Sequence, residues 1–245
     1  MIHLSGHSGC TVVLLDDKTV RKTSHSSQYD HRLYCQMEKQ IQFSNPNIKS
    51  PKVLSHGVSS NGRFFYDMEY IQGRNLCDVF RTESSFYCKS VIERLLGIHD
   101  GKDHTIDISH ILESKIMKLG GEKDLPIIQS CDWKVPAGYC HGDLTFENII
   151  ISDNGVYLID FLDSFVDCPI IDEAKLLQDA FCYWSFRDGY VPKRKLISVC
   201  EMFHTKRHYC ILLVHLMRIL PYASQTTKEN VLWMMDSVRT KINQF

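Results

Sequence analysis

Apolar and polar residues alternate in short runs through the first seventy positions of the 245-residue chain. Between residues 27 and 43 the spacing changes to that of a helix, with Tyr34, Met37 and Ile41 on one face. This region therefore predicts a small sheet with one helix. The predicted strands are residues 2–4, 11–15, 19–23, 53–54 and 64–71.

After Gly73 the apolar residues mostly recur at helical spacing, so the rest of the chain is predicted to be mainly helical. A capping box at Thr226 and Glu229 is expected to open the last helix. The other predicted helical segments are residues 75–80, 85–99, 106–119 and the chain from 172 onward.

Two strand-like runs, residues 148–152 and 156–161, interrupt this helical region. Asp153-Asn154-Gly155 between them is a good turn sequence, so the pair predicts a hairpin. The fold class expected from the whole pattern is α+β.

The composition excludes several classes of protein. With 28 Lys plus Arg against 29 Asp plus Glu, the net charge is -1. The chain therefore lacks the basic excess that is typical of nucleic-acid-binding proteins. Ten cysteines without a CxxC pair, and an N-terminus without an export signal, favour reduced thiols and a cytoplasmic location. The longest apolar stretch, residues 209–220, is too short and too polar to span a membrane.

The segment YCHGDLTFENIIISDNGVYLIDFLDS places four polar residues around the predicted hairpin: His141, Asp143, Asn148 and Asp160. Phosphoryl transfer requires a carboxylate that accepts the proton of an attacking hydroxyl, and oxygen ligands that hold Mg²⁺ against nucleotide phosphates. Asp143, Asn148 and Asp160 supply these groups within one loop system. A polar turn between buried strands is the alternative interpretation, and we favour the catalytic one.

HGDLTFEN followed by LIDF resembles the catalytic motif of the aminoglycoside phosphotransferase and choline kinase families, relatives of the protein kinases. The resemblance implies a bilobal, protein-kinase-like fold with a small β-rich N-lobe and a mainly helical C-lobe. Residues 1–70 would form the N-lobe that covers the nucleotide, and residues 71–73 the hinge. Residues 74–245 would form the C-lobe, with the catalytic loop and the acceptor site.

The resemblance also implies a role for each motif residue. Asp143 would be the catalytic residue, and Asn148 and Asp160 would bind Mg²⁺. His141 would brace the catalytic loop. Asp172 would either support the same loop or cap the helix that follows.

Kinase chemistry further needs a lysine on the third strand and an acid on the next helix. Lys22 and Glu38 are the candidates, with a solvated lysine and a surface acid as the alternative. Gly6, Ser8 and Gly9 lie between the first two predicted strands, where backbone amides approach phosphates in kinases. The match is loose, because a serine takes the place of the middle glycine.

The run FFYDMEYIQG looks like the fifth strand and hinge of the same families. Met68 would be the gatekeeping side chain, and the backbone of Glu69, Tyr70 and Ile71 would bind the purine. An ordinary buried strand with a glycine exit is the alternative. Because the backbone would bind the purine, the side chains of this segment do not indicate whether ATP or GTP is preferred.

The resulting prediction is a kinase that uses ATP or GTP and Mg²⁺ to phosphorylate a hydroxyl of a small molecule, with a sugar or sugar derivative favoured. A protein kinase is disfavoured, because His-Gly-Asp lacks the arginine of the protein-kinase motif. A catalytically inactive nucleotide-binding module is disfavoured by the complete set of polar residues. The oligomeric state is left open.

The even charge balance hides a polarised chain. Residues 1–173 carry 17 basic and 24 acidic side chains, a net of -7, whereas residues 174–245 carry 11 and 5, a net of +6. A basic helical region matches polycationic aminoglycosides poorly, so a neutral or anionic acceptor is favoured.

Two further groups of residues have open roles. Asp163 follows the LIDF run and is either a second metal contact or, as we favour, a solvated acid. Cys200, His204 and His208 recur every four residues on a predicted helix, which is a weak zinc signal, because three turns of one helix converge poorly on a tetrahedral ion.

Overall fold

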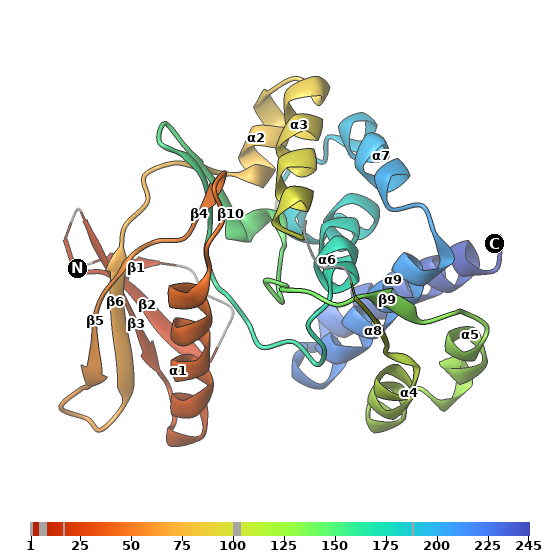
Figure 1. Ribbon diagram of the computed structural model, residues 1–245, viewed down its shortest axis with the longest axis horizontal. Helices are drawn as coiled ribbons and strands as arrows, with labels where there is room; N and C mark the ends of the chain where they lie inside the picture. Colours follow the sequence, from red (N-terminus) through yellow and green to blue (C-terminus); the bar gives the residue numbers. More distant parts are fainter. Residues whose placement is uncertain (1, 5–8, 17, 100–103, 188) are drawn as a thin grey trace. The chain divides into compact units, whose positions relative to one another are not determined.

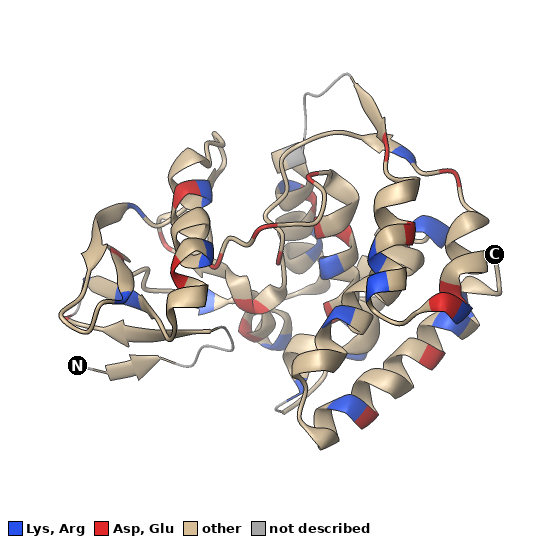
Figure 2. Cartoon of the chain, turned by 90° about the horizontal axis from the view of Figure 1, so that it is seen from below, with Lys and Arg blue, Asp and Glu red and all other residues tan. Residues whose placement is uncertain are grey.

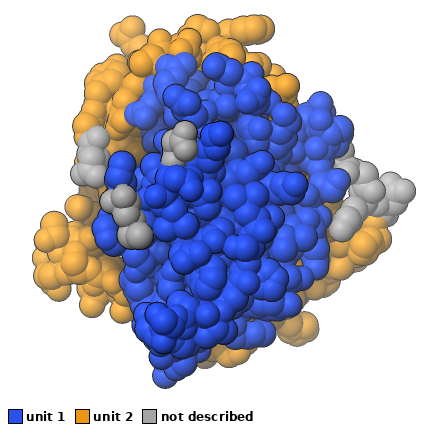
Figure 3. All heavy atoms as spheres, turned by 90° about the vertical axis from the view of Figure 1, so that its left-hand side faces the viewer, with its two compact units in different colours: residues 1–79, 141–143, 147–163 blue, residues 80–140, 144–146, 164–245 orange. Residues whose placement is uncertain are grey.

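The computed structural model describes residues 2–4, 9–16, 18–99, 104–187 and 189–245 (Figure 1). The chain packs as two compact units, coloured separately in Figure 3. Unit 1 contains residues 1–79, 141–143 and 147–163. Unit 2 contains residues 80–140, 144–146 and 164–245.

Unit 1 is built on an antiparallel five-stranded sheet of order β1-β2-β3-β6-β5, as the alternating pattern predicted. Helix α1 (Ser27–Gln42) places Leu33 and Met37 in a core with Val20 and Tyr66 of the sheet, because alternate strand residues share one face. The strands are β1 (Ile2–Leu4), β2 (Cys10–Leu14), β3 (Thr19–Ser24), β5 (Val53–Val58) and β6 (Phe64–Glu69).

A second sheet of unit 1 contains the predicted hairpin. Its order is β4-β11-β10-β7, so both hairpin strands pair with strands from earlier in the chain. This pairing groups the hairpin with residues 1–79, whereas we expected residues 74–245 to form one lobe. The strands are β4 (Ile48–Lys49), β7 (Arg74–Asn75), β10 (Ile149–Ser152) and β11 (Gly155–Leu158).

Unit 2 is helical apart from the two-stranded sheet of β8 (Thr105–Asp107) and β9 (Lys134–Pro136). Helix α8 (Lys206–Ile219) lies in its core, with every residue from Tyr209 to Met217 buried. No helix in the described ranges has both the length and the apolar character to cross a bilayer.

After β7, the described residues form the helices α2 (Leu76–Thr82), α3 (Ser85–Leu96), α4 (Ser109–Lys118), α5 (Leu125–Gln129), α6 (Pro169–Cys182), α7 (Lys193–Met202), α8 (Lys206–Ile219) and α9 (Gln225–Ile242). Short 3₁₀ turns lie at Gly97–His99, Glu122–Asp124, Phe146–Asn148, Trp184–Phe186 and Leu220–Tyr222.

Two predicted helix starts were wrong. Residues 105–107 are a strand, because Ile106 pairs with Val135 across the sheet, and such a long-range pairing leaves no local periodicity. The last helix begins two residues earlier than the capping box at Thr226 predicted, because the N-cap is Ser224, which accepts a hydrogen bond from the Thr227 backbone N–H at 3.3 Å.

His215 on α8 is a buried base in the core of unit 2. Its side chain is 1% exposed, Nε2 lies 3.1 Å from the Ile171 carbonyl oxygen, and Nδ1 has no hydrogen-bond partner. Burial, together with the nearby charges of Lys175 and Arg218, lowers the pKa of His215 well below its ordinary value. The imidazole therefore stays neutral in the folded protein.

We expect this histidine to make the fold acid-sensitive. The unfolded chain binds a proton at His215 near pH 6.5 and the folded chain does not, so the free energy of unfolding falls as the pH drops below that value. At one pH unit below 6.5, protonation of His215 in the unfolded chain lowers the free energy of unfolding by about 1.4 kcal/mol. Urea unfolding should show that the free energy of unfolding falls less between pH 7.5 and pH 5.5 in His215→Gln than in the wild type. Equal losses in the two proteins would contradict the assignment.

Candidate active site

The loop after β11 is hydrogen-bonded on both sides of Asp160. The Ile159 N–H donates to the Asn148 carbonyl oxygen at 3.0 Å, and the Leu162 N–H donates to the His141 carbonyl oxygen at 3.0 Å. Asp160 itself has a φ of 62°, a left-handed conformation that costs a non-glycine residue energy unless its surroundings hold it. The two flanking bonds supply that restraint.

His141 is fully buried and uses both ring nitrogens inside unit 1. Nε2 lies 2.9 Å from the Ile159 carbonyl oxygen, and Nδ1 lies 3.3 Å from the Asp143 backbone N–H. A carbonyl can only accept and an N–H can only donate, so Nε2 carries the hydrogen and the ring is neutral. This arrangement fits a residue that supports the loop rather than one that exchanges protons.

Asn148 is oriented by the half-buried Asp143. Its Nδ2 donates to the Asp143 carbonyl oxygen at 2.9 Å and lies 3.2 Å from Asp143 Oδ2. The amide has one nitrogen and one oxygen, so these bonds leave Oδ1 as the group available to a cation.

Lys22 on β3 is 2% exposed, and its Nζ donates to Asp160 Oδ1. Burial alone would lower the pKa of Lys22, but the Asp160 carboxylate, with smaller effects from Tyr66 and Cys10, raises it overall. Burial also raises the pKa of Tyr66, the cross-strand partner of Lys22, to about 12. The site therefore holds a charged ammonium beside a neutral phenol.

The expected pairing of Lys22 with Glu38 does not occur among the described residues, because Asp160 takes that place. Glu38 is half-buried on α1. The neighbouring Lys39, which the sequence analysis missed, instead donates from Nζ to the Leu162 carbonyl oxygen at 2.8 Å. Helix α1 thus contacts the Asp160 loop through a lysine, for which no motif gave a signal.

The residues present fit a magnesium ion. The Asp160 side chain is 33% exposed and accepts a cationic partner, and Asn148 presents an amide oxygen. Mg²⁺ prefers such oxygen ligands and keeps several waters. Asp163 is exposed on the same loop, as a solvated acid would be.

Of the predicted glycine-rich loop, Gly6 and Ser8 lie outside the described residues. Gly9 is described, and its carbonyl oxygen accepts from the His25 N–H at 3.0 Å. A Cβ at Gly9 would lie 2.8 Å from the Tyr29 ring, so this position needs glycine for close packing.

The three residues that we expected to bind the purine differ in the hydrogen bonds of their backbone N–H groups. The Glu69 N–H donates to the Lys52 carbonyl oxygen at 3.0 Å, and the Tyr70 N–H donates to the Lys18 carbonyl oxygen at 2.7 Å. The Ile71 N–H makes no hydrogen bond within the described part of the chain.

Met68, the expected gatekeeper, is 6% exposed and lies in the unit 1 core. Its sulfur lies 3.6 Å from Gln40 Nε2 on α1. The side chain therefore helps to fix the strand that precedes the hinge.

Asp172 belongs to unit 2, where it is fully buried in the first turn of α6. It does not cap this helix, because Cys168 occupies the N-cap position. A second buried carboxylate, Asp179, was missed: it accepts from the backbone N–H groups of Phe146 and Ser185, the latter at 2.9 Å. An acid two residues after the Leu176-Leu177 pair gave no sequence signal for this role.

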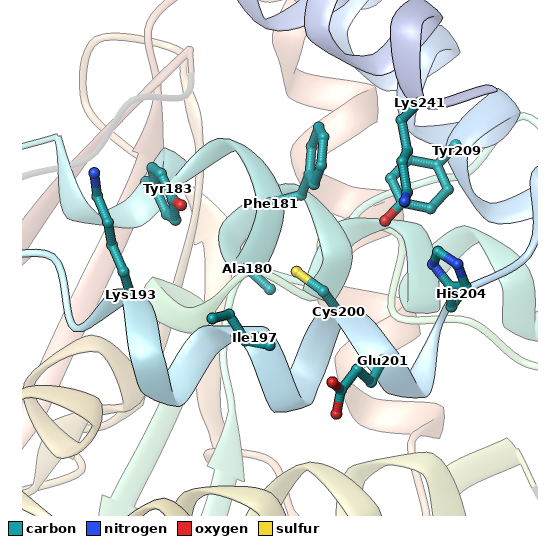
Figure 4. Close-up of a pocket in the computed structure, with 10 residues that line it drawn as sticks. All are labelled: Ala180, Phe181, Tyr183, Lys193, Ile197, Cys200, Glu201, His204, Tyr209 and Lys241. Carbon is teal, nitrogen blue, oxygen red and sulfur yellow. The ribbon is translucent and has the colours of Figure 1, made fainter. Parts of the chain in front are cut away.

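The helix on which the zinc interpretation rested is two helices. Cys200 lies on α7, which ends at Met202, and His208 lies on α8, which begins at Lys206. Figure 4 shows Cys200 and His204 on the wall of a cavity of about 320 Å³. His208 points elsewhere, with Nε2 2.8 Å from Glu173. Within the described residues, no group of three or more His, Cys, Asp and Glu is placed to hold a metal ion.

Gly142, between His141 and Asp143, has a φ of 90°, and a Cβ there would lie 2.2 Å from the Leu162 carbonyl oxygen. We expect Gly142→Ala to lower the free energy of unfolding by more than the roughly 1–3 kcal/mol of backbone strain alone. Gly62→Ala is the matched control, because Gly62 has a φ of 75° and open space around it. Denaturant unfolding of both variants measures the difference, and equal losses would contradict the close approach of the two loops.

A family model described as the phosphotransferase enzyme family matches residues 4–191. Solved structures are similar over nearly the whole chain. The GDP and kanamycin complex of APH(2″)-IIia is 14% identical, with a TM-score of 0.71 and coverage of 100% of this chain and 93% of that one. No curated protein sequence matches.

A thermostable aminoglycoside phosphotransferase APH(4)-Ia, solved with AMP-PNP and hygromycin B, is 10% identical, with a TM-score of 0.70 and coverage of 99% and 92%. The GDP complex of aminoglycoside 2′-phosphotransferase-IIIa is 16% identical, with a TM-score of 0.65 and coverage of 99% and 92%. These likenesses confirm the predicted kinase-like fold class.

Proposed function

The chain belongs to the phosphotransferase enzyme family, and from this premise we propose that it transfers the terminal phosphate of ATP or GTP to a hydroxyl of a small molecule. The observation that supports this proposal best is the ion pair between the buried Lys22 and the partly exposed Asp160, held beside the loop that carries Asp143 and Asn148. All four residues belong to unit 1. They provide a phosphate-binding cation, two metal ligands and a base.

Each residue has a distinct role in the proposed reaction. Lys22 would bind the nucleotide phosphates through its charged ammonium, and Asn148 and Asp160 would hold Mg²⁺, which neutralises phosphate charge when bound. Asp143 would orient the acceptor hydroxyl and take its proton. His141 would keep the loop in place through its two ring nitrogens. The Ile71 N–H would donate to the purine edge.

The nucleotide donor follows from the same arrangement. Solved relatives of similar fold contain GDP or AMP-PNP, so both purines occur in this architecture. Recognition through a backbone N–H at Ile71 is compatible with either base, and we therefore propose both ATP and GTP as donors.

For the acceptor we favour a sugar or sugar derivative that is neutral or anionic. Support comes from the excess of basic over acidic residues after position 173, shown with the other charges in Figure 2. Part of this excess is structural, because Arg239 forms a bidentate pair with Asp124 and Lys195 Nζ donates to the Phe80 carbonyl oxygen at 2.7 Å. Exposed Lys193 and Arg194 remain to attract an anion.

Asp143→Asn should lower turnover by a factor of roughly 10²–10⁴, because the amide cannot accept the proton of the acceptor. Nucleotide binding should be retained, since Lys22 and Asp160 are unchanged. ADP or GDP release, measured against a panel of hydroxylated metabolites, gives the rate. Asp163→Asn, an exposed acid of the neighbouring loop, is the matched control and should keep its activity. An unchanged rate in Asp143→Asn would rule out this assignment.

The same panel tests the acceptor. Sugars and sugar derivatives, neutral or anionic, should stimulate nucleotide hydrolysis or transfer above background, whereas kanamycin-like polycations should not. Efficient turnover of kanamycin would contradict the proposed charge preference and leave the proposed phosphotransfer intact. Labelling of generic protein acceptors instead of metabolites would favour a protein kinase.

A further inference from the structure

Two thiols of unit 2 lie in contact although they are 79 residues apart in the sequence. Cys131 follows α5, and Cys210 lies on α8, with their sulfur atoms 3.9 Å apart. Cys210 is fully buried and Cys131 is half-buried. The pair therefore has one member within reach of solvent and one in the core.

The segment that carries Cys131 is held against α8 by a second contact. Arg207 Nη1 donates to the Lys134 carbonyl oxygen at 3.0 Å. Arg207 and Cys210 are three residues apart on one helix and so share a face. On the other side of the segment, Trp133 is buried and its Nε1 donates to the Ile128 carbonyl oxygen at 2.7 Å. The proximity of the two sulfurs is thus built into the packing.

A shallow cavity of about 320 Å³ opens over Cys131. Its walls include the cationic side chains of the first turn of α8. The residues that line it are Ser130, Cys131, Asp132, Thr205, Lys206 and Arg207. A small oxidant can therefore reach Cys131, whereas the buried Cys210 has Cys131 as its neighbour.

We propose that Cys131 and Cys210 form a reversible disulfide when the protein meets a hydroperoxide. The Cys131 sulfur attacks the peroxide, the O–O bond breaks, and an alcohol or water leaves with the Cys131 proton, which gives a sulfenic acid. The Cys210 sulfur then displaces the hydroxyl group, which departs as water with the Cys210 proton. The two thiols lose two electrons and the peroxide gains them. A dithiol reductant reverses the bond.

The geometry requires only a small movement. A disulfide bond is about 2.05 Å long, so the sulfurs must approach by about 1.9 Å. Cys131 lies outside helices and strands, so rotation of its side chain and adjustment of its loop can provide this. Burial raises the pKa of the Cys210 thiol and so lowers its reactivity toward the oxidant, which leaves the first step to the more accessible Cys131.

The disulfide would join α8 to the segment that leads through β9 to His141. It would close a long loop of the unfolded chain and so raise the melting temperature of the oxidised protein by several degrees. The proposal does not rest on the proposed function, because neither thiol belongs to the site assembled around Asp143.

The experiment treats the full chain with hydrogen peroxide and maps disulfides by mass spectrometry of a non-reduced tryptic digest. Cleavage after Lys and Arg gives DLPIIQSCDWK with Cys131 and HYCILLVHLMR with Cys210, one cysteine in each. The linked pair should appear after peroxide and disappear after dithiothreitol. Its absence from oxidised protein, or preferential linkage of Cys131 to another cysteine, would overturn the proposal.

Three variants separate the pair from general thiol oxidation. Cys131→Ser and Cys210→Ala should abolish both the linked peptide and the rise in melting temperature on oxidation. Cys35→Ser, which removes another half-buried thiol, should change neither. If Cys210→Ala folds poorly because Cys210 is buried on α8, Cys131→Ser still tests the proposal, since Cys131 lies in a loop. A rise of the wild-type size in oxidised Cys131→Ser would contradict the proposal.

Discussion

The site in unit 1 depends on one buried ammonium group. Lys22 is almost fully enclosed by the sheet, and a charge in that position is tolerated only beside an opposite charge. Asp160 supplies it from a loop 138 residues away. The need to neutralise Lys22 therefore connects β3 to the hairpin loop. Removal of Asp160 would leave the buried ammonium uncompensated, whereas Asp160, which is 33% exposed, would keep its contact with water if Lys22 were removed.

The loop that presents Asp160 is shaped by its hydrogen bonds rather than by the preference of its own backbone. Its left-handed φ is maintained by bonds from its neighbours to His141 and Asn148, and Lys39 adds a third from α1. His141 contributes its ring to the same network and is thereby kept neutral. The residues closest to the proposed chemistry are thus fixed in position before any ligand arrives, which is how an enzyme reduces the entropic cost of reaction.

Much of this site could be predicted, because its residues form a local motif whose chemistry depends on residue type and spacing. His141, Asp143, Asn148 and Asp160 come together in one unit, as the motif implied. The partner of Lys22 was predicted wrongly as Glu38, because the contact with Asp160 joins residues 138 positions apart and only the three-dimensional packing shows it. Lys39 and Asp179 act through backbone carbonyl and N–H groups, which any sequence offers at every position.

The fold was predictable where a local pattern in the sequence determines the structure. The alternation in residues 1–70 and the turn at residues 153–155 identified the sheet and the hairpin. The pairing of β10 and β11 with β7 and β4 was not predictable, because two-residue strands carry no periodicity. Helix ends were less predictable, because they depend on details of capping. The last helix is capped by Ser224 and not by Thr226, and a break at residues 203–205 separates α7 from α8, which we expected to be one helix.

We propose that Lys22 and Asp160 together bind a nucleotide with its metal ion. The most direct test is calorimetric titration of non-hydrolysable ATP and GTP analogues, with and without Mg²⁺, into the wild type and Asp160→Asn, after the melting temperature has shown that the variant is folded. We expect Mg²⁺ to tighten binding to the wild type at least tenfold, or about 1.4 kcal/mol, and to have little effect on the variant. Binding to the wild type that is unchanged by Mg²⁺, or a variant that keeps the full effect, would contradict it.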